Sequence, residues 1–111
     1  MPINHANAHT LLAPSEYPDV RDIFLQAFFV SRPARSEQYA VGMLHALRNR
    51  VAGEPFTSTP YQQGTVQFDA YMAGYQEGKN RWKSHQEEQA QMMHHVSAKE
   101  ISDKDAARVA A

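Results

Sequence analysis

Four of the five tyrosines in this chain stand three residues ahead of four of its five glycines. On an α-helix, positions i and i+3 share a face, so each pair sets an aromatic ring beside a position without a side chain. Glycine inside a helix costs about 1 kcal/mol relative to alanine, which implies that close approach of another segment compensates for it. The pairs are Tyr39 with Gly42, Tyr61 with Gly64, Tyr71 with Gly74, and Tyr75 with Gly78. The repeat indicates close packing rather than chemistry.

Two helices are predicted in the first half of the chain. The first begins at about residue 15 or 17 and runs to residue 30, because acidic residues and a proline suit its first turn and apolar residues recur at helical spacing. The second starts at Ser36 as its N-cap and runs to Ala52, with Gly53 as its C-terminal stop. An arginine and proline break separates the two helices.

A third helix has the strongest apolar pattern. Thr65 is its predicted cap, and apolar residues follow one helical stripe over residues 66–82. We expect a polar continuation over residues 83–96, with fraying. Capping patterns that begin at Ser97 and Ser102 predict a short, weakly apolar helix after it.

The second and third predicted helices carry the tyrosine and glycine pairs that could face each other, whereas Tyr61 and Gly64 fall in or beside the loop between them. The repeat therefore predicts the seam of a helical hairpin, with rings filling the gaps and hydroxyls reaching the rim. Gly74 and Gly78 also form two notches on one face, so a homodimer through the third helix is an alternative.

These elements predict an all-α fold, either a small helical hairpin or a three-helix arrangement. With 111 residues the chain is the size of one compact domain. We expect a flexible, extended lead-in over residues 1–14, a single helical domain over residues 15–84, and a polar helical or partly disordered tail over residues 85–111. Leu11 and Leu12 are expected to pin the lead-in to the core.

Composition narrows the class of protein. The absence of cysteine excludes disulfides, thiolate zinc sites and cysteine nucleophiles, and it favours an intracellular, cytoplasmic location. No apolar stretch reaches the roughly 18 residues of a membrane helix. The net charge is −1, but residues 32–83 hold seven Lys and Arg against four Asp and Glu, a local excess of three positive charges.

Candidate catalytic and metal-binding residues are few. His94 and His95 are adjacent and point to different helix faces, whereas His85 and Glu88 could form half of a metal site at i, i+3 spacing. His45 lacks any nearby nucleophile motif. We predict a protein that is not an enzyme and that has no metal and no cofactor.

Aromatic and basic residues are the strongest candidates for partner or RNA binding. Stacking rings beside cations are typical of proteins that bind single-stranded RNA, whereas a core stripe with a basic rim is the favoured structural alternative. The predicted binding residues are Arg48, Arg50, Tyr61, Tyr75, Lys79, Arg81, Trp82 and Lys83.

The middle of the chain resembles a known family. The segments that carry the resemblance are Tyr-Ala-Val-Gly at residues 39–42, Pro-Tyr at residues 60–61 and Ala-Tyr-Met-Ala-Gly-Tyr-Gln-Glu-Gly at residues 70–78. They resemble the ribosome modulation factor family and its plasmid-borne relatives over about 45 of the 111 residues. The resemblance implies a two-helix hairpin whose framework includes Tyr61, Tyr71, Gly74 and Tyr75, and binding to the small ribosomal subunit in resting bacteria.

The expected function is that of a small regulatory binding protein of bacterial or bacteriophage origin. It would dock on a host protein or ribonucleoprotein complex, with the ribosome as the first target to test and RNA contact as a possibility. The alternative is a phage or mobile-element inhibitor that blocks a host enzyme or defence complex by protein contacts alone. A third reading is small-molecule modification, suggested for some plasmid-borne relatives of the family.

Overall fold

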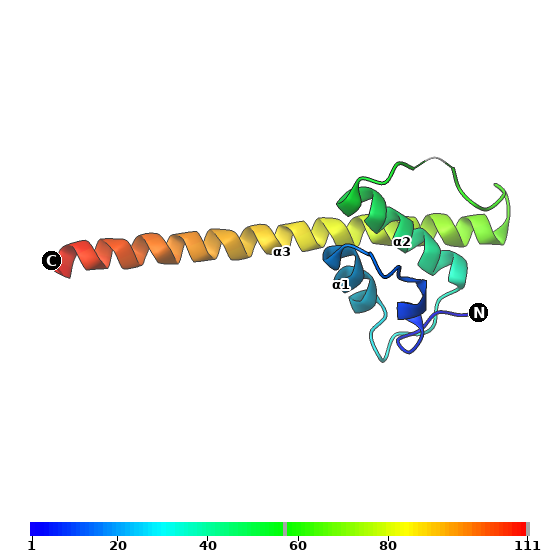
Figure 1. The fold of residues 1–111 in the computed structure, drawn as a ribbon, viewed down its shortest axis with the longest axis horizontal. Coiled ribbons are helices and arrows are strands. Elements are labelled where there is room, and N and C mark those ends of the chain that lie inside the picture. The colour runs from blue at the N-terminus through cyan, green and yellow to red at the C-terminus, as the bar shows by residue number, and fades with distance from the viewer. Residues whose placement is uncertain (57, 111) are drawn as a thin grey trace.

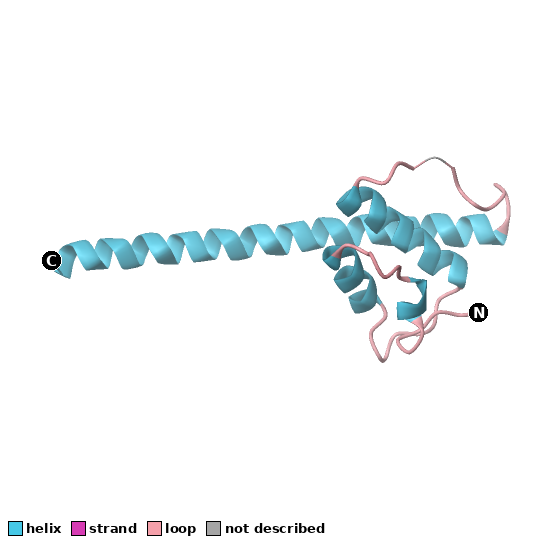
Figure 2. Ribbon diagram, viewed as in Figure 1, coloured by secondary structure: helices cyan, strands magenta, loops and turns pink. Residues whose placement is uncertain are grey.

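The structure, a computed structural model, describes the backbone of residues 1–56 and 58–110 and the side chains of residues 1–56 and 58–93. Within these residues the chain is helical and contains no strand (Figure 2). The elements are a short 3-10 helix, η1 (Ala8–Leu11), and the α-helices α1 (Pro18–Ala27), α2 (Glu37–Ala52) and α3 (Val66–Ala110). The all-α prediction is confirmed.

α1, α2 and the first part of α3 form a small globular part, and the rest of α3 projects from it (Figure 1). α2 crosses α3 with both helices running in the same general direction, and the loop between them returns along the pair (Figure 1). α1 and the N-terminal segment pack beside them. Of the two predicted arrangements, the three-helix arrangement therefore describes the fold. α2 and α3 run in the same direction because the loop over residues 53–65 is long enough to span the length of α2.

Local capping chemistry sets both ends of α2 as expected. The Ser36 hydroxyl accepts a hydrogen bond from the Tyr39 amide at 3.2 Å, and Gly53 adopts the left-handed conformation with φ of 73°. The Thr65 hydroxyl likewise accepts from the Phe68 amide at 3.1 Å at the start of α3. These three predictions are confirmed, since each depends on residues within one helical turn.

α1 is shorter than predicted. It begins at Pro18 and ends at Ala27, where the guanidinium of Arg32 donates to the Ala27 carbonyl oxygen at 2.6 Å. Phe28 then turns into the core, while Phe29 and Val30 are 51% and 79% exposed. The apolar run therefore divides into a buried helix and an exposed loop, a boundary that a helical pattern alone does not reveal.

The N-terminal segment is packed, in contrast to the flexible lead-in expected for residues 1–14. The backbone of Ile3 exchanges two hydrogen bonds with that of Arg35, at 2.6 and 2.9 Å, and both Ile3 and Ala8 are buried. Leu11 and Leu12 also pack against the core, as predicted. The backbone pairing ties the start of the chain to the residue just before the α2 cap.

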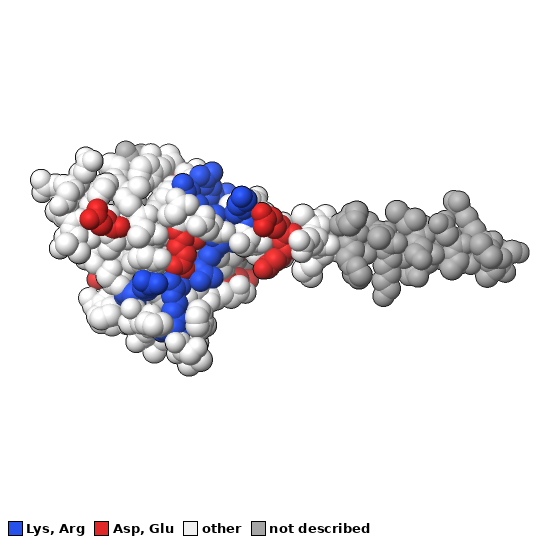
Figure 3. All heavy atoms as spheres, turned by 180° about the vertical axis from the view of Figure 1, so that it is seen from behind, with Lys and Arg blue, Asp and Glu red and all other residues white. Residues whose placement is uncertain are grey.

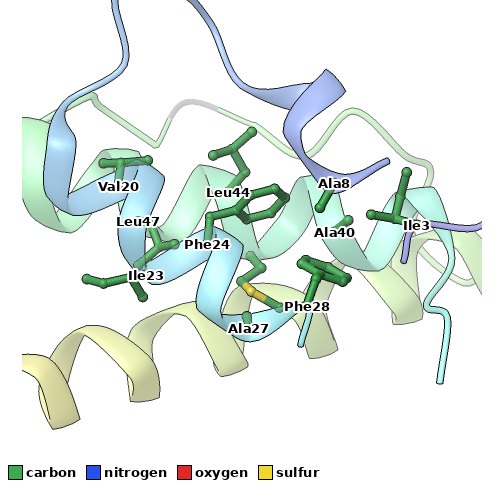
Figure 4. Packing of buried hydrophobic residues seen from close by; sticks show 11 residues of the cluster. Ile3, Ala8, Val20, Ile23, Phe24, Ala27, Phe28, Ala40, Leu44 and Leu47 are labelled. Atoms are coloured by element: carbon green, nitrogen blue, oxygen red, sulfur yellow. The ribbon is translucent and has the colours of Figure 1, made fainter. Parts of the chain in front are cut away.

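The hydrophobic core lies between α1 and α2. Phe24 of α1 and Phe28, the residue that follows α1, have ring centroids 5.1 Å apart, and small and branched side chains of α2 face them (Figure 4). Burial of apolar area here drives the docking of α1, at about 25 cal/mol per Å². The buried set is Ile3, Ala8, Val20, Ile23, Phe24, Ala27, Phe28, Ala40, Met43, Leu44 and Leu47.

The glycines form the seam between α2 and α3. A Cβ added to Gly74 would lie 2.7 Å from the carbonyl carbon of Tyr39, and one added to Gly42 would lie 2.9 Å from that of Tyr71. Two Tyr-x-x-Gly units thus pack reciprocally, each glycine under the backbone of the other unit's tyrosine. At Gly78 an added Cβ would meet the Met43 carbonyl oxygen at 2.6 Å. The predicted close approach is confirmed.

This seam also bears on the homodimer alternative. The notches at Gly74 and Gly78 are filled by α2 of the same chain, so the spacing that motivated a dimer is explained by intrachain packing.

α3 is one continuous helix from Val66 to Ala110, far longer than its apolar stripe. Ser97 and Ser102 fall within its span instead of opening a separate helix, and their side chains lie outside the described residues. Among the described residues, no helix combines the length and the apolar character needed to cross a membrane.

Candidate functional site

The eight predicted binding residues fall into three places in the structure. Four of them line one open groove between the end of α2 and α3: Arg50, Lys79, Trp82 and Lys83. Tyr61 and Tyr75 belong to an aromatic cluster beside it. Arg48 is held in an ion pair that joins α2 to the segment before α1, and Arg81 is held in an ion pair with Glu77 within α3.

The groove, which we call the basic groove, has a volume of about 510 Å³. Arg50 lies in the last turn of α2, and Lys79 and Lys83 lie one turn apart on α3. In the part of the chain whose side chains are described, none of these three lies within 4.0 Å of a carboxylate oxygen. The basic groove is lined by Arg50, Gln76, Lys79, Asn80, Trp82, Lys83 and Gln86, none of which is acidic. Three cations are therefore available to an anionic ligand.

Trp82 forms the apolar part of this groove and also belongs to the rim of the core. Its indole packs partly against the core cluster and stacks on His85 at 5.6 Å, with the rings 22° from parallel. Within the aromatic stripe, Tyr71 is fully buried while Trp82 remains partly exposed.

Aromatic rings lead from the basic groove toward the loop between α2 and α3. The Lys79 ammonium lies 6.0 Å from the centroid of the Tyr75 ring, which lies 5.2 Å from Phe56 and 6.2 Å from Tyr71. The Tyr61 ring also packs against Tyr71, with the ring centroids 5.7 Å apart. Phe56 was not predicted as a site residue, although an exposed aromatic between two prolines of a loop is a signal that could have identified it.

A small hollow lies at the end of these rings. It has a volume of about 160 Å³ between α2 and the following loop. Within it, His45 Nδ1 lies 2.8 Å from the Tyr71 hydroxyl, and burial, reinforced by the charge of Arg48, lowers the pKa of His45. The lining residues are His45, Arg48, Asn49, Glu54, Pro55, Phe56, Ser58 and Tyr71. The hollow combines aromatic walls with polar groups, of which Arg48 and Glu54 are charged.

Glu77 explains why Arg81 does not line the basic groove. Its carboxylate accepts from Arg32 at 2.6 and 2.8 Å, from the Tyr39 hydroxyl at 2.5 Å and from Arg81 Nε at 2.5 Å. Burial alone would raise the pKa of Glu77, but these hydrogen bonds outweigh it and lower that pKa to about 2. Acidic and basic side chains accordingly lie next to each other on the face seen in Figure 3.

Arg48 also forms an ion pair, in this case with a residue outside its own helix. Its Nε and Nη2 donate to the two carboxylate oxygens of Glu16, both at 2.8 Å, and the Glu16 side chain is only 5% exposed. Hydrogen bonding from Arg48 lowers the pKa of Glu16. Arg48 therefore joins α2 to the segment before α1, and it also lines the hollow.

The predicted half-site for a metal is not completed by the described side chains. His85 Nε2 lies 4.0 Å from Asp19, and no group of three or more His, Asp or Glu residues is placed to hold an ion among residues 1–56 and 58–93. His94 and His95 lie outside the described side chains.

Comparison with protein-family models, with curated proteins and with solved structures returns no match to this chain.

Proposed function

We propose that this chain is a small, non-enzymatic binding protein that docks on an RNA-containing assembly through the basic groove. The observation that carries the proposal is the convergence of Arg50, Lys79 and Lys83, none paired with a described carboxylate, beside the partly exposed Trp82. Cations that neutralise phosphates release counterions, and exposed rings stack on unpaired bases. A local patch matters here because the whole chain carries a net charge of −1.

Three phosphate contacts set the strength of such binding. Each contributes about −0.7 to the slope of log K against log salt for a single strand, so raising salt from about 50 to about 200 mM should weaken binding roughly 20-fold. Gln76, Asn80 and Gln86 add uncharged hydrogen-bonding groups along the groove without repelling phosphate. The groove therefore fits a polyanion that also presents polar edges.

The test is the affinity for a fluorescein-labelled oligouridine, followed by anisotropy at low salt. Lys79→Gln with Lys83→Gln should weaken binding at least several-fold. The control, Arg21→Gln with Arg35→Gln, removes the same charge from exposed sites outside the groove and should bind as the unmodified protein does. Equal weakening by both pairs would show that only net charge matters, and it would contradict a specific groove.

Within this proposal the ribosome is the first assembly to test, as the family resemblance implies. Co-sedimentation with ribosomes at low salt should retain the protein and should lose the Lys79→Gln, Lys83→Gln variant. Protein that stays in the supernatant while still binding oligouridine would exclude the ribosome and leave another RNA-containing assembly as the target.

A second candidate function is inhibition of a host enzyme or defence complex by protein contacts. The exposed Phe29 and Val30, adjacent in the loop between α1 and α2, favour it because neighbouring exposed apolar side chains are typical of protein interfaces. Capture of one RNA-free complex that survives high salt, and that is lost on Phe29→Ser, would support this function over RNA docking.

A further inference from the structure

We propose that the hollow lined by His45, Phe56 and Tyr71 binds a nucleobase, and that this base belongs to the strand held in the basic groove. The inference rests on the proposed function for the identity of the strand. It assigns a separate ring-binding site to the loop between α2 and α3.

The walls of the hollow suit a planar ring. Tyr71 and His45 meet edge to face, with centroids 5.5 Å apart, and they are fixed by the 2.8 Å hydrogen bond between the tyrosine hydroxyl and His45 Nδ1. Phe56 is 49% exposed and closes the side toward the loop. The volume of about 160 Å³ admits one heteroaromatic ring system but not a folded peptide segment.

The polar groups of the hollow offer both donors and acceptors. Asn49 uses its amide nitrogen to donate to the Glu54 carbonyl oxygen at 2.7 Å, which leaves its Oδ1 as an acceptor. With Nδ1 of His45 bonded to Tyr71, Nε2 is the remaining ring nitrogen. The Ser58 hydroxyl also lines the site. Such a mixture matches the edge of a base, which presents donors and acceptors side by side.

The charges around the hollow argue against the binding of a phosphate group there. Arg48 is already paired with Glu16, Glu54 is a lining residue whose negative charge acts on both Arg48 and His45, and burial lowers the pKa of His45. An anion would gain no unpaired cation here and would meet Glu54. The hollow therefore selects an uncharged polar ring, whereas the basic groove selects phosphate.

Aromatic contacts connect the two places. The Lys79 ammonium lies over the Tyr75 ring at 6.0 Å, and Tyr75 contacts Phe56 at 5.2 Å. Phosphates over Lys79 would thus place the neighbouring nucleotide beside Tyr75 and Phe56, and Phe56 also lines the hollow. This arrangement alternates a cation with stacking surfaces, as binding of a single strand requires.

The experiment uses the full chain and an oligouridine with one central 2-aminopurine, whose fluorescence is quenched by ring stacking. Phe56→Leu should relieve the quenching and weaken binding roughly 5- to 150-fold, the range for losing one base stack, without changing the salt slope. Phe29→Leu is the matched control, because Phe29 is 51% exposed but lies in the other loop, and it should behave as the unmodified protein does.

The outcomes separate the two proposals. Tight, quenched binding that Phe56→Leu does not alter would overturn the base site and leave the groove intact. If no strand binds at low salt, the proposed function fails, and titration with free adenosine and uridine, followed by the NMR signals of the His45 ring, decides the hollow. Saturable shifts that Phe56→Leu abolishes would support a base site for free nucleosides, and unchanged signals would overturn it.

Discussion

Replacing Gly74 by alanine places a methyl group against the backbone of α2. The nearest atom to the added Cβ is the Tyr39 carbonyl oxygen, and the Tyr39 carbonyl carbon follows at 2.7 Å, whereas ordinary contact begins at 3.4 Å, so α2 and α3 must separate by more than about 0.7 Å. No side-chain rotation can relieve this, because the obstacle is backbone. Overpacking of this kind costs about 1 to 3 kcal/mol.

The higher helix propensity of alanine opposes the cost of crowding, so the net change in stability is the difference between the two effects. Alanine is better than glycine inside a helix by about 1 kcal/mol. With the crowding at the upper end of its range, we expect Gly74→Ala to destabilise the fold by about 2 kcal/mol, which lowers Tm by roughly 10 °C for a domain of this size.

The assay is thermal and urea unfolding followed by circular dichroism. Gly42→Ala should cost a similar amount, and the double variant should cost less than the sum, because one separation of the helices relieves both methyl groups. Gly53→Ala is the control for adding a methyl group without crowding. Nothing lies within 4 Å of a Cβ added at Gly53, so only the φ of 73° opposes this change. A Gly74→Ala protein with a raised Tm, or strict additivity with Gly42→Ala, would refute the reciprocal seam.

Four further outcomes follow from the polar contacts. Glu77→Gln leaves Arg32 buried without its countercharge and should cost about 3 kcal/mol in urea unfolding, while the exposed Glu87→Gln should cost little. Because the pKa of Glu77 is about 2 in the folded state against 4.5 ordinarily, stability should fall as pH drops from 4.5 toward 2, and less so in Glu77→Gln. The lowered pKa of His45 means that the unfolded chain binds a proton first, so stability should also fall as pH drops through 6.5, a component that His45→Gln removes. Ser36→Ala should cost about 1 kcal/mol and speed amide exchange in the first turn of α2.

Features that depend on neighbouring residues could be predicted from the sequence. The ends of α2 follow from Ser36 and Gly53, and the seam follows from glycines spaced by helical turns. The course of the chain between α2 and α3 could not be read in this way. Periodicity shows which faces pack, but not whether two helices run in the same or in opposite directions.

Features that depend on contacts between residues far apart in the sequence could not be predicted. α1 ends at Ala27 because Arg32 caps it, and Arg32 is itself held by Glu77, 45 residues away. Arg48 was predicted to bind a partner, but Glu16, 32 residues away, occupies it. Among the side chains of residues 1–56 and 58–93, the i, i+4 pair of Glu77 and Arg81 was the one ion pair that spacing could have revealed.

The candidate site was therefore predicted in part. Arg50, Lys79, Trp82 and Lys83 do share a groove, because the crossing of α2 over α3 brings the last turn of α2 beside them. The hollow at His45 was not anticipated, since it is made by a loop whose path depends on the direction of the helices it joins.

The salt dependence of RNA affinity tests the basic groove most directly. For oligouridine, the slope of log K against log salt should be about −2 for the unmodified protein, and it should become shallower by about 1.4 in the Lys79→Gln, Lys83→Gln variant, since each lost phosphate contact removes about 0.7. An unchanged slope in that variant, or no binding at about 50 mM salt, would contradict the assignment of the groove to RNA.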